Sequence, residues 1–434
     1  MQEFNRSAEI IAMEKLFDRL WPINRSITGD GVRHTHDILG ELVPLTRTEV
    51  PSGSHIFDWI VPPEWELNEA YIIDPNGHRI LDVQENNLHL ISYSSPFRGT
   101  LSKSELEDHL HSLPDLPDAI PYLTSYYNQT WGFCLSQKER VSLPEGNYKI
   151  VVDTKLKTNG SMTISEAVLP GETEDEVLIS TYTCHPSMAN NELSGPLVAA
   201  FLYQRLAAMP SRRLTYRFAF LVETIGAIAY LHQKGEHLKQ RLKAGLVATC
   251  VGLDVPFTYK RSLRGNTLID RIMGQVLKEE NVDHSIIDFF PWGSDERQYC
   301  SPGFDLPVGS LMRGSYLDFP EYHTSLDNRD LISFAAISES VDVYLATCMA
   351  LERNIIYRNL VANGEPQLGK YNLYPKVGSL RQVETERQEL LWFLSLADGR
   401  RDLLEIASTS GVSIERLEAA ARKCLETQIV EIVH

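Results

Sequence analysis

Apolar residues recur at helical spacing close to the amino terminus of the chain. Over residues 7–20 the apolar positions lie three or four apart, which predicts a helix that ends at Trp21 and Pro22. A turn follows at residues 26–31, and we expect a second short helix to run to about Leu42.

The pattern changes between residues 50 and 148. Short apolar runs such as 55–61 and 88–93 alternate with Pro, Gly and Asn turns, and a helix is expected near residues 104–111. This alternation of apolar runs and turns predicts a small β-rich module. Its histidines, His89, His109 and His111, have no carboxylate nearby at a ligand spacing, which favours structural roles over metal binding.

From residue 149 onward, predicted strands alternate with predicted helices. The expected strands span residues 148–152, 177–183, 216–223, 246–253, 285–290 and 306–311. The expected helices span residues 197–208, 225–233, 267–280 and 332–353. This alternation predicts an α/β fold with a mostly parallel sheet sandwiched by helices.

The last part of the chain has a different organisation. Residues 354–380 have the Gly and Pro breaks of a linker, and three short helices are expected at 389–396, 402–408 and 414–427. A β-branched stretch at 429–433 completes the order expected of a winged-helix module. From residue 381 to the end there are three more acidic than basic residues, which favours protein contacts over DNA binding.

Composition and charge narrow the possible functions. The 434 residues carry a formal net charge of -17, which argues against general nucleic-acid binding and against an anionic membrane surface as partner. The six cysteines are far apart and form no C-x-x-C pair, so neither a disulfide framework nor a thiolate zinc site is indicated. We expect no secretory signal, no membrane span and a cytoplasmic location.

Candidate chemistry begins in the stretch from Val177 to Gly195. A predicted buried strand ends on Cys184 and His185, a polar loop carries Asn190-Asn191-Glu192, and a helical pattern follows. Open α/β sheets bind ligands at the carboxyl ends of their strands. A histidine there, with amide and carboxylate groups on the next loop, is a plausible start to a metal site.

Four further polar groups occur at predicted strand ends or on the loop before the last long helix. They are Glu223 with Thr224, Asp254 after Leu253, Asp295-Glu296-Arg297, and the run Glu321-Tyr322-His323 to Asp327. Taken singly, Asp327 could cap a helix and Asp295 to Arg297 could form a salt-bridged turn. Taken together, repeated acids and histidines at strand ends suit zinc or a similar divalent ion.

Several longer stretches carry a family resemblance. They are 51–53, 57–59, 87–89, 113–115, 131–134, 293–299 and 321–325. On these stretches the chain resembles a bacterial group of aminopeptidase-like proteins associated with polysaccharide biosynthesis, within the zinc aminopeptidase and glutamate carboxypeptidase-like superfamily. The resemblance implies an α/β domain from residues 1–48 and 149–360, an inserted β-rich domain at 49–148, and a winged-helix domain at 378–434.

The resemblance also implies roles for individual residues. The first metal histidine of the superfamily matches His185, and the last matches His323. Its metal-bridging aspartate falls at Asn191, and a further metal aspartate falls near Leu253 or Asp254. Its glutamate pair, a general base followed by a ligand, falls at Glu223 and Thr224. These roles are what the resemblance implies, and each residue is numbered as in this sequence.

Two of these positions depart from the superfamily pattern. Asn191 is a neutral amide where the superfamily has an anionic bridge, and Thr224 cannot replace a carboxylate ligand. One zinc ion is therefore expected rather than two, held by His185, His323 and a carboxylate. Glu223 is either that ligand or the base.

These residues lead to the hypothesis that the protein is a metal-dependent hydrolase, which cleaves an amide or peptide bond in a small substrate with activated water. Glu223 would be the base, Tyr322 and Arg297 would stabilise the oxyanion, and Asp295 or Glu296 would bind a substrate amino group. Two alternatives stay open: a catalytically degenerate binding protein of the same fold, and a winged-helix regulator. A homo-oligomer is compatible with the sequence.

Overall fold

The computed structural model describes residues 5–316, 318–373 and 380–433. The expected start of the winged helix at residue 378, and residues 374–379 of the expected linker, lie outside the described residues. The described chain forms two compact units. The first runs to Ile269 and resumes over His284–Asp342, and the second comprises Asp270–Asp283 and the chain from Val343 onward.

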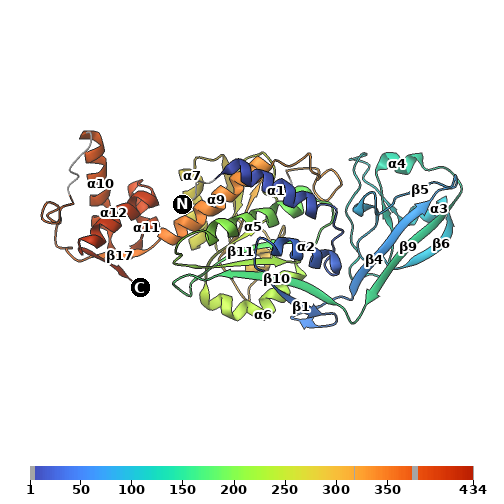
Figure 1. The fold of residues 1–434 in the computed structure, drawn as a ribbon, viewed down its shortest axis with the longest axis horizontal. Helices are drawn as coiled ribbons and strands as arrows, with labels where there is room; N and C mark the ends of the chain where they lie inside the picture. Colours follow the sequence, from blue (N-terminus) through green and yellow to red (C-terminus); the bar gives the residue numbers. More distant parts are fainter. Residues whose placement is uncertain (1–4, 317, 374–379, 434) are drawn as a thin grey trace. The chain divides into compact units, whose positions relative to one another are not determined.

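An eight-stranded mixed sheet forms the centre of the first unit (Figure 1). Its strand order is β1 (Thr46–Pro51), β10 (Ser161–Leu169), β12 (Thr215–Leu221), β11 (Glu176–Tyr182), β13 (Leu242–Ala248), β16 (Val308–Arg313), β14 (Phe257–Lys260) and β15 (His284–Ile287). The four central strands from β12 to β16 are parallel, whereas β1, β10 and β14 pair antiparallel with their inner neighbours. The sequence analysis missed those three antiparallel strands.

Helices cover both faces of this sheet. In Figure 1, α1 (Arg6–Leu20) and α5 (Ser194–Ala207) lie on one side of it and α6 (Ile225–Arg241) lies on the other. Gly195 allows α5 to approach the sheet, because a Cβ at this position would lie 2.2 Å from the carbonyl oxygen of Ala248. The unit also contains α2 (Asp30–Gly40) and the short α8 (Glu296–Tyr299).

Some expected elements have different bounds in the structure. The strand expected at 246–253 begins and ends earlier, as β13, and the helix expected at 225–233 continues to Arg241. The apolar run 88–93 is not a strand. It is a 3-10 turn, η1 (Asn87–His89), followed by isolated bridges from Leu90 and Ser92.

The inserted region is rich in β-structure, as expected. A four-stranded antiparallel sheet has the order β5 (Arg79–Ile80), β4 (Glu64–Ile73), β9 (Asn147–Lys157) and β6 (Phe97–Ser102). The strand expected at residues 148–152 in the mostly parallel sheet is β9, so it belongs to this sheet instead. Smaller elements are β2 (His55–Ile56), β3 (Trp59–Ile60), α3 (Lys103–Leu106), η2 (Glu107–His109), β7 (Leu110–His111), β8 (Phe133–Cys134) and α4 (Gln137–Ser142). The buried side chains of this region and of the large sheet belong to one hydrophobic cluster.

The second unit contains the order of elements expected for a winged helix. Its elements are α7 (Leu268–Glu279), the end of α9 (Phe334–Arg353), β17 (Ile356–Asn359), α10 (Leu380–Leu396), β18 (Asp398–Asp402), α11 (Leu403–Ser410), α12 (Ile414–Glu426) and β19 (Val430–Val433). β17 pairs antiparallel with both β18 and β19. Asp402 begins α11 with a capping box, in which Glu405 is the reciprocal partner.

Of the helices in the described residues, α9 alone has the length and apolar composition to cross a membrane. Within its most apolar window, 67% is buried inside the protein. A helix in the core of a folded domain has the same properties.

Candidate metal centre

His185 lies three residues beyond the end of β11, the central strand of the sheet. Thr183 extends the strand, because its N–H donates to the carbonyl of Leu221 at 2.9 Å. The loop then enters η3 (Ala189–Leu193), one turn of π-helix that carries Asn190, Asn191 and Glu192 before α5 begins. Single turns of π-helix are frequent at functional sites.

Asp327 ties this loop to the segment that carries His323. Its buried carboxylate accepts the backbone N–H groups of Asn190 at 2.6 Å and Asn191 at 2.8 Å. Asp327 is therefore not the cap of the following helix. That helix begins at Phe334, and the Ser333 hydroxyl accepts an N–H from its first turn.

The structure brings His185, Glu223 and His323 together. The ring centroids of the two histidines are 5.4 Å apart, and His185 Nε2 is 3.5 Å from Glu223 Oε2. Two imidazoles that share one tetrahedral zinc ion have centroids about 5 Å apart. His323 Nε2 is buried and has no hydrogen-bond partner among the described residues. The observed spacing and this vacant nitrogen both fit a shared divalent ion.

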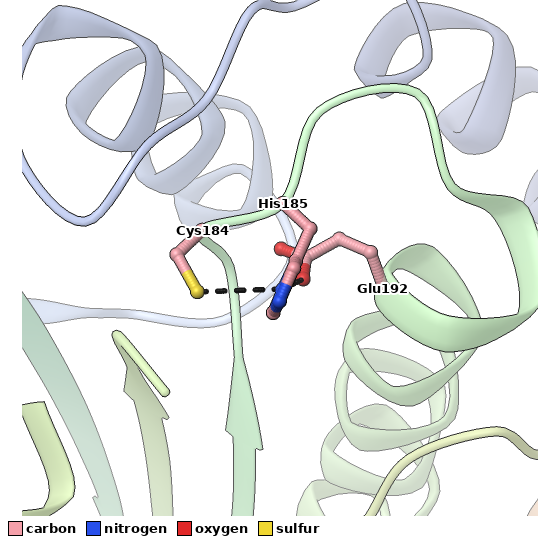
Figure 2. Close-up of side chains that lie close together, drawn as sticks. All are labelled: Cys184, His185 and Glu192. Atoms are coloured by element: carbon pink, nitrogen blue, oxygen red, sulfur yellow. Dashed lines mark hydrogen bonds and ion pairs between the residues drawn. The ribbon is translucent and has the colours of Figure 1, made fainter. Parts of the chain in front are cut away.

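Glu192 determines which nitrogen of His185 is free. Its Oε2 atom lies 2.7 Å from His185 Nδ1, and Figure 2 shows the carboxylate beside the ring. A carboxylate on Nδ1 fixes the tautomer that leaves Nε2 free for a metal, as in many histidine-ligated zinc sites. Nε2 is the nitrogen closest to Glu223 in the ion pairs of the site.

Cys184 is close to the same group without being a good ligand. The Cys184, His185 and Glu192 ligand atoms lie within 4.8 Å of one another, and Figure 2 shows the sulfur pointing toward the imidazole. Burial, followed by the charges of Glu192 and Glu223, raises the pKa of the Cys184 thiol well above its ordinary value. Its Sγ atom approaches His185 at Nδ1, at 3.5 Å, which is the nitrogen that Glu192 already contacts.

The protonation states of the other groups suit a cation. Burial lowers the pKa of His185 and of His323 to about 3, so both rings are neutral and keep a lone pair for a metal. Burial raises the pKa of Glu192 to about 8 against the opposing effect of Arg25. Burial, and next the charge of Asp295, raises the pKa of Glu223 well above its ordinary value. A divalent ion would offset this excess of buried acid.

Arg25 supports the site and was not identified from the sequence. Its guanidinium is fully buried, and its Nε donates to the backbone oxygen of His185 at 2.9 Å. The same atom lies 3.9 Å from Glu192 Oε1. Arg25 and His185 are 160 positions apart in the chain, so no local pattern could have predicted the contact.

A strained turn presents Glu223. Thr224 has a φ of 62° and a ψ of -79°, and the N–H of Ile225 donates to the carbonyl of Glu223 at 2.8 Å. These values define a γ-turn of the rare, strained kind. The N–H of Thr224 donates to Asp295 Oδ1 at 2.7 Å, and Arg297 Nη2 donates to the Thr224 hydroxyl at 2.9 Å. Asp295 and Arg297 thus hold the turn in place.

Among the other residues selected from the sequence, Tyr322 lies beside the site, whereas Glu296, Asp254 and Asn191 do not contact the histidines. Glu296 is fully buried, and Lys260 Nζ contacts its carboxylate at 2.7 Å. Asp254 is exposed and makes no ion pair or hydrogen bond with the histidines in the part of the chain that the structure describes. The Asn191 side chain faces Tyr182, Cys250 and Met188. Tyr322 stacks on His323 with the ring centroids 3.9 Å apart.

A cavity of about 210 Å³ opens beside His185 and Glu223. Its lining residues are Ile27, Trp59, Tyr126, Tyr127, Cys184, His185, Glu223, Thr224 and Ile225. The inserted region thus supplies an aromatic wall opposite the groups of the α/β region. A fourth aromatic residue from the inserted region, Tyr122, packs edge-on against both His185 and His323. The sequence analysis assigned no role to these aromatic residues, because no local motif marks them.

Comparisons with known proteins give the same division of the chain. The family model described as a domain of unknown function, DUF4910, matches residues 14–354, and a winged helix-turn-helix model matches residues 355–432. A protein of Clostridium acetobutylicum is 43% identical over 96% of this chain and 95% of its own length. It is named as a candidate polysaccharide biosynthesis protein with an aminopeptidase-like domain.

Solved structures agree on the fold. A candidate peptidase from Clostridium acetobutylicum superposes with a TM-score of 0.92 and 41% identity, covering 99% of this chain and 98% of its own. A zinc aminopeptidase from Bacillus subtilis reaches a TM-score of 0.58 at 15% identity, covering 80% of this chain and 95% of its own. A peptidase M28 precursor from Shewanella amazonensis has the same TM-score at 12% identity over 80% of this chain and 93% of its own. The last two share the fold alone.

Proposed function

The chain belongs to the DUF4910 family and combines an aminopeptidase-like fold with a carboxyl-terminal winged helix, and from that premise we propose that it is a metal-dependent hydrolase of amide bonds. The observation that carries the proposal is the approach of two neutral imidazoles, His185 and His323, whose centroids are 5.4 Å apart beside the carboxylate of Glu223. One zinc ion fits this donor set better than two, because Asn191 and Thr224 are neutral.

Each residue has a role in the proposed reaction. His185 and His323 would hold the ion through Nε2, and Glu192 fixes the His185 ring through Nδ1. A bound zinc ion would lower the pKa of the attacking water from about 16 toward 7. Glu223 accepts the proton of that water and donates it to the leaving nitrogen. Burial raises the pKa of this carboxyl, which favours its acceptance of the water proton.

The reaction is proposed to serve polysaccharide biosynthesis in the cytoplasm. The Clostridium acetobutylicum relative that is named as a candidate polysaccharide biosynthesis protein is 43% identical over nearly the whole chain. The winged helix is not proposed as the functional end of the protein, since its net charge is acidic and phosphate contacts require basic surfaces.

Zinc binding and hydrolysis, measured on the same preparations, test the proposal. We expect the full-length protein to bind about one zinc ion per chain. We expect His323→Ala to lose the ion, and Glu223→Gln to keep it while hydrolysing a panel of aminoacyl amides and N-acyl amines at least ~100-fold more slowly. Glu85→Gln, at an exposed position, is the matched control. If Glu223→Gln loses zinc as completely as His323→Ala, then Glu223 is a ligand and not the base.

A second function is supported by the two departures from the superfamily pattern. The Asn191 amide oxygen accepts the Tyr182 hydroxyl at 3.3 Å, and Thr224 offers no carboxylate. A protein that binds an amide-containing ligand without hydrolysing it would keep the same cavity. Binding of a compound of the panel by a protein that takes up no zinc and hydrolyses none of the panel would support this second function.

A further inference from the structure

The cavity beside His185 and Glu223 has few charges to offer a substrate. Among the described residues that line it, Glu223 alone carries a carboxylate, and the proposed reaction uses that group as the base. Glu296 is fully buried and contacts Lys260 at 2.7 Å, and Asp295 is fully buried with one oxygen on the Thr224 N–H. Neither acid lines the cavity, so the substrate-binding role expected of them from the sequence has no support in this geometry.

This arrangement bears on the kind of amide that the cavity accepts. The substrate of an aminopeptidase carries a free ammonium group next to the bond that is cleaved. An ammonium group that leaves water needs a carboxylate partner, or it pays a large desolvation cost. With Glu223 committed to proton transfer, the cavity has no second carboxylate for that purpose. A neutral N-acyl group fits the site better than a peptide amino terminus.

The opposite wall of the cavity is aromatic. Trp59 and Tyr127 remain 38% and 55% exposed, and their ring centroids lie 6.2 Å apart at an interplanar angle of 61°. The Tyr127 hydroxyl donates to the backbone oxygen of Ile60 at 3.0 Å, which fixes this ring against the β2–β3 hairpin. Exposed apolar surface next to a pocket commonly marks a place that a ligand covers. Aromatic faces of this kind stack on the C–H face of a sugar ring.

We propose that the cavity binds an N-acylated amino sugar, with the sugar ring against Trp59 and Tyr127 and the N-acyl group beside His185 and Glu223. This substrate class rests on the proposed amide hydrolase and on its link to polysaccharide synthesis. A volume of about 210 Å³ admits a single ring and a short acyl chain rather than a long peptide.

The reaction balances with water as the only co-substrate. The water oxygen bonds to the acyl carbon, and the bond from that carbon to the sugar nitrogen breaks. Glu223 carries one proton from the water to the nitrogen. The products are a carboxylic acid and a free amino sugar. No oxidant or reductant takes part.

Binding is tested apart from turnover with the zinc-loaded Glu223→Gln protein. N-acetylglucosamine, N-acetylgalactosamine and N-acetylmannosamine are the probes, and saturation-transfer NMR and calorimetry report binding. We expect at least one of them to bind, and Trp59→Leu in the same background to weaken binding about five- to tenfold. Trp392→Leu, at an exposed tryptophan of the second unit, should change binding less than twofold.

Turnover is tested with the zinc-loaded wild-type protein by release of primary amine. We expect an N-acetylated amino sugar to be hydrolysed at least tenfold faster than leucine amide. Hydrolysis of leucine amide with no sugar binding overturns the substrate class and leaves the hydrolase in place. Sugar binding that depends on Trp59, with no amide hydrolysed, supports the sugar site and overturns the hydrolase. Absence of both binding and hydrolysis overturns both.

Discussion

Replacing Glu192 with glutamine tests which nitrogen of His185 takes the metal. The Glu192 carboxylate is fully buried and lies 2.7 Å from His185 Nδ1. Glutamine keeps an oxygen that can accept the Nδ1 proton, but it cannot carry the negative charge that a bound ion favours on Glu192 and that makes the ring a stronger donor through Nε2. Loss of such a carboxylate partner lowers metal affinity by about 10- to 100-fold. We therefore expect zinc to bind Glu192→Gln more weakly by about 1.4–2.7 kcal/mol.

The measurement is zinc affinity by competition with a chelator, with urea unfolding of the zinc-free protein in parallel. The unfolding data separate weaker zinc binding from loss of folded protein, which matters because the buried Arg25 lies 3.9 Å from Glu192 and loses the carboxylate near it. Glu85→Gln, an exposed substitution of the same type, should bind zinc as the wild type does. Equal zinc affinity in Glu192→Gln and the wild type would refute the assignment of Glu192 as the group that orients His185.

Cys184→Ser distinguishes between two possible positions of the ion. If the ion instead lay among Cys184, His185 Nδ1 and Glu192, both the serine and the glutamine variants would lose zinc as completely as His185→Ala. With the ion on Nε2, Cys184 is not a ligand, because its Sγ atom approaches Nδ1 instead, so Cys184→Ser should bind zinc with wild-type affinity.

Three further predictions concern the framework of the site. Burial lowers the pKa of His36 to about 3 from 6.5, so the unfolded chain binds the extra proton as pH falls, and His36 alone should account for about 2 kcal/mol of the stability lost between pH 7.5 and pH 5. The free energy of unfolding of His36→Gln, measured with urea, should lack this loss, whereas that of His34→Gln, a substitution at an exposed position, should keep it. Stability that falls equally with pH in His36→Gln and in the wild type would contradict the reasoning. Gly195→Ala should cost about 1–3 kcal/mol in the same assay because of the 2.2 Å approach to a backbone oxygen, and a neutral effect would show that α5 shifts freely. Asp295→Ala leaves the Thr224 N–H without its acceptor and should cost about 1–3 kcal/mol, whereas Asp295→Asn should cost less; equal losses would assign the effect to packing.

The apolar pattern around residues 177–195 correctly predicted the strand and the helix that flank the loop. The expected strand and helix correspond to β11 and α5, because a continuous apolar run and a helical repeat have distinct periods. The approach of His185 and Glu223 was expected from the family resemblance, and it arises because β11 and β12 are parallel neighbours whose carboxyl ends lie at the same edge of the sheet. The winged helix was likewise predicted from its order of helices and its β-branched end.

Features that depend on distant contacts were not predictable in this way. The run 88–93 has the composition of a strand, yet its backbone makes isolated bridges with Phe133 and Thr124 rather than a ladder. Arg25 is a charged residue in the loop between α1 and α2, and nothing near it in sequence indicates that it is fully buried against His185. The aromatic wall of the cavity combines residues 59 and 126–127, which come together only through the tertiary fold.

The two sides of the cavity come from separate stretches of the chain: the aromatic side from the inserted region, and the groups proposed for bond cleavage from the loops of the α/β sheet. During divergence of this family, exchange of the exposed rings can therefore alter ligand preference while the histidine and carboxylate geometry is inherited unchanged. This exchange of side chains is limited, because the inserted region and the sheet share one hydrophobic core. Variation is expected at solvent-facing rings such as Trp59 and Tyr127, and not at the side chains packed beneath them.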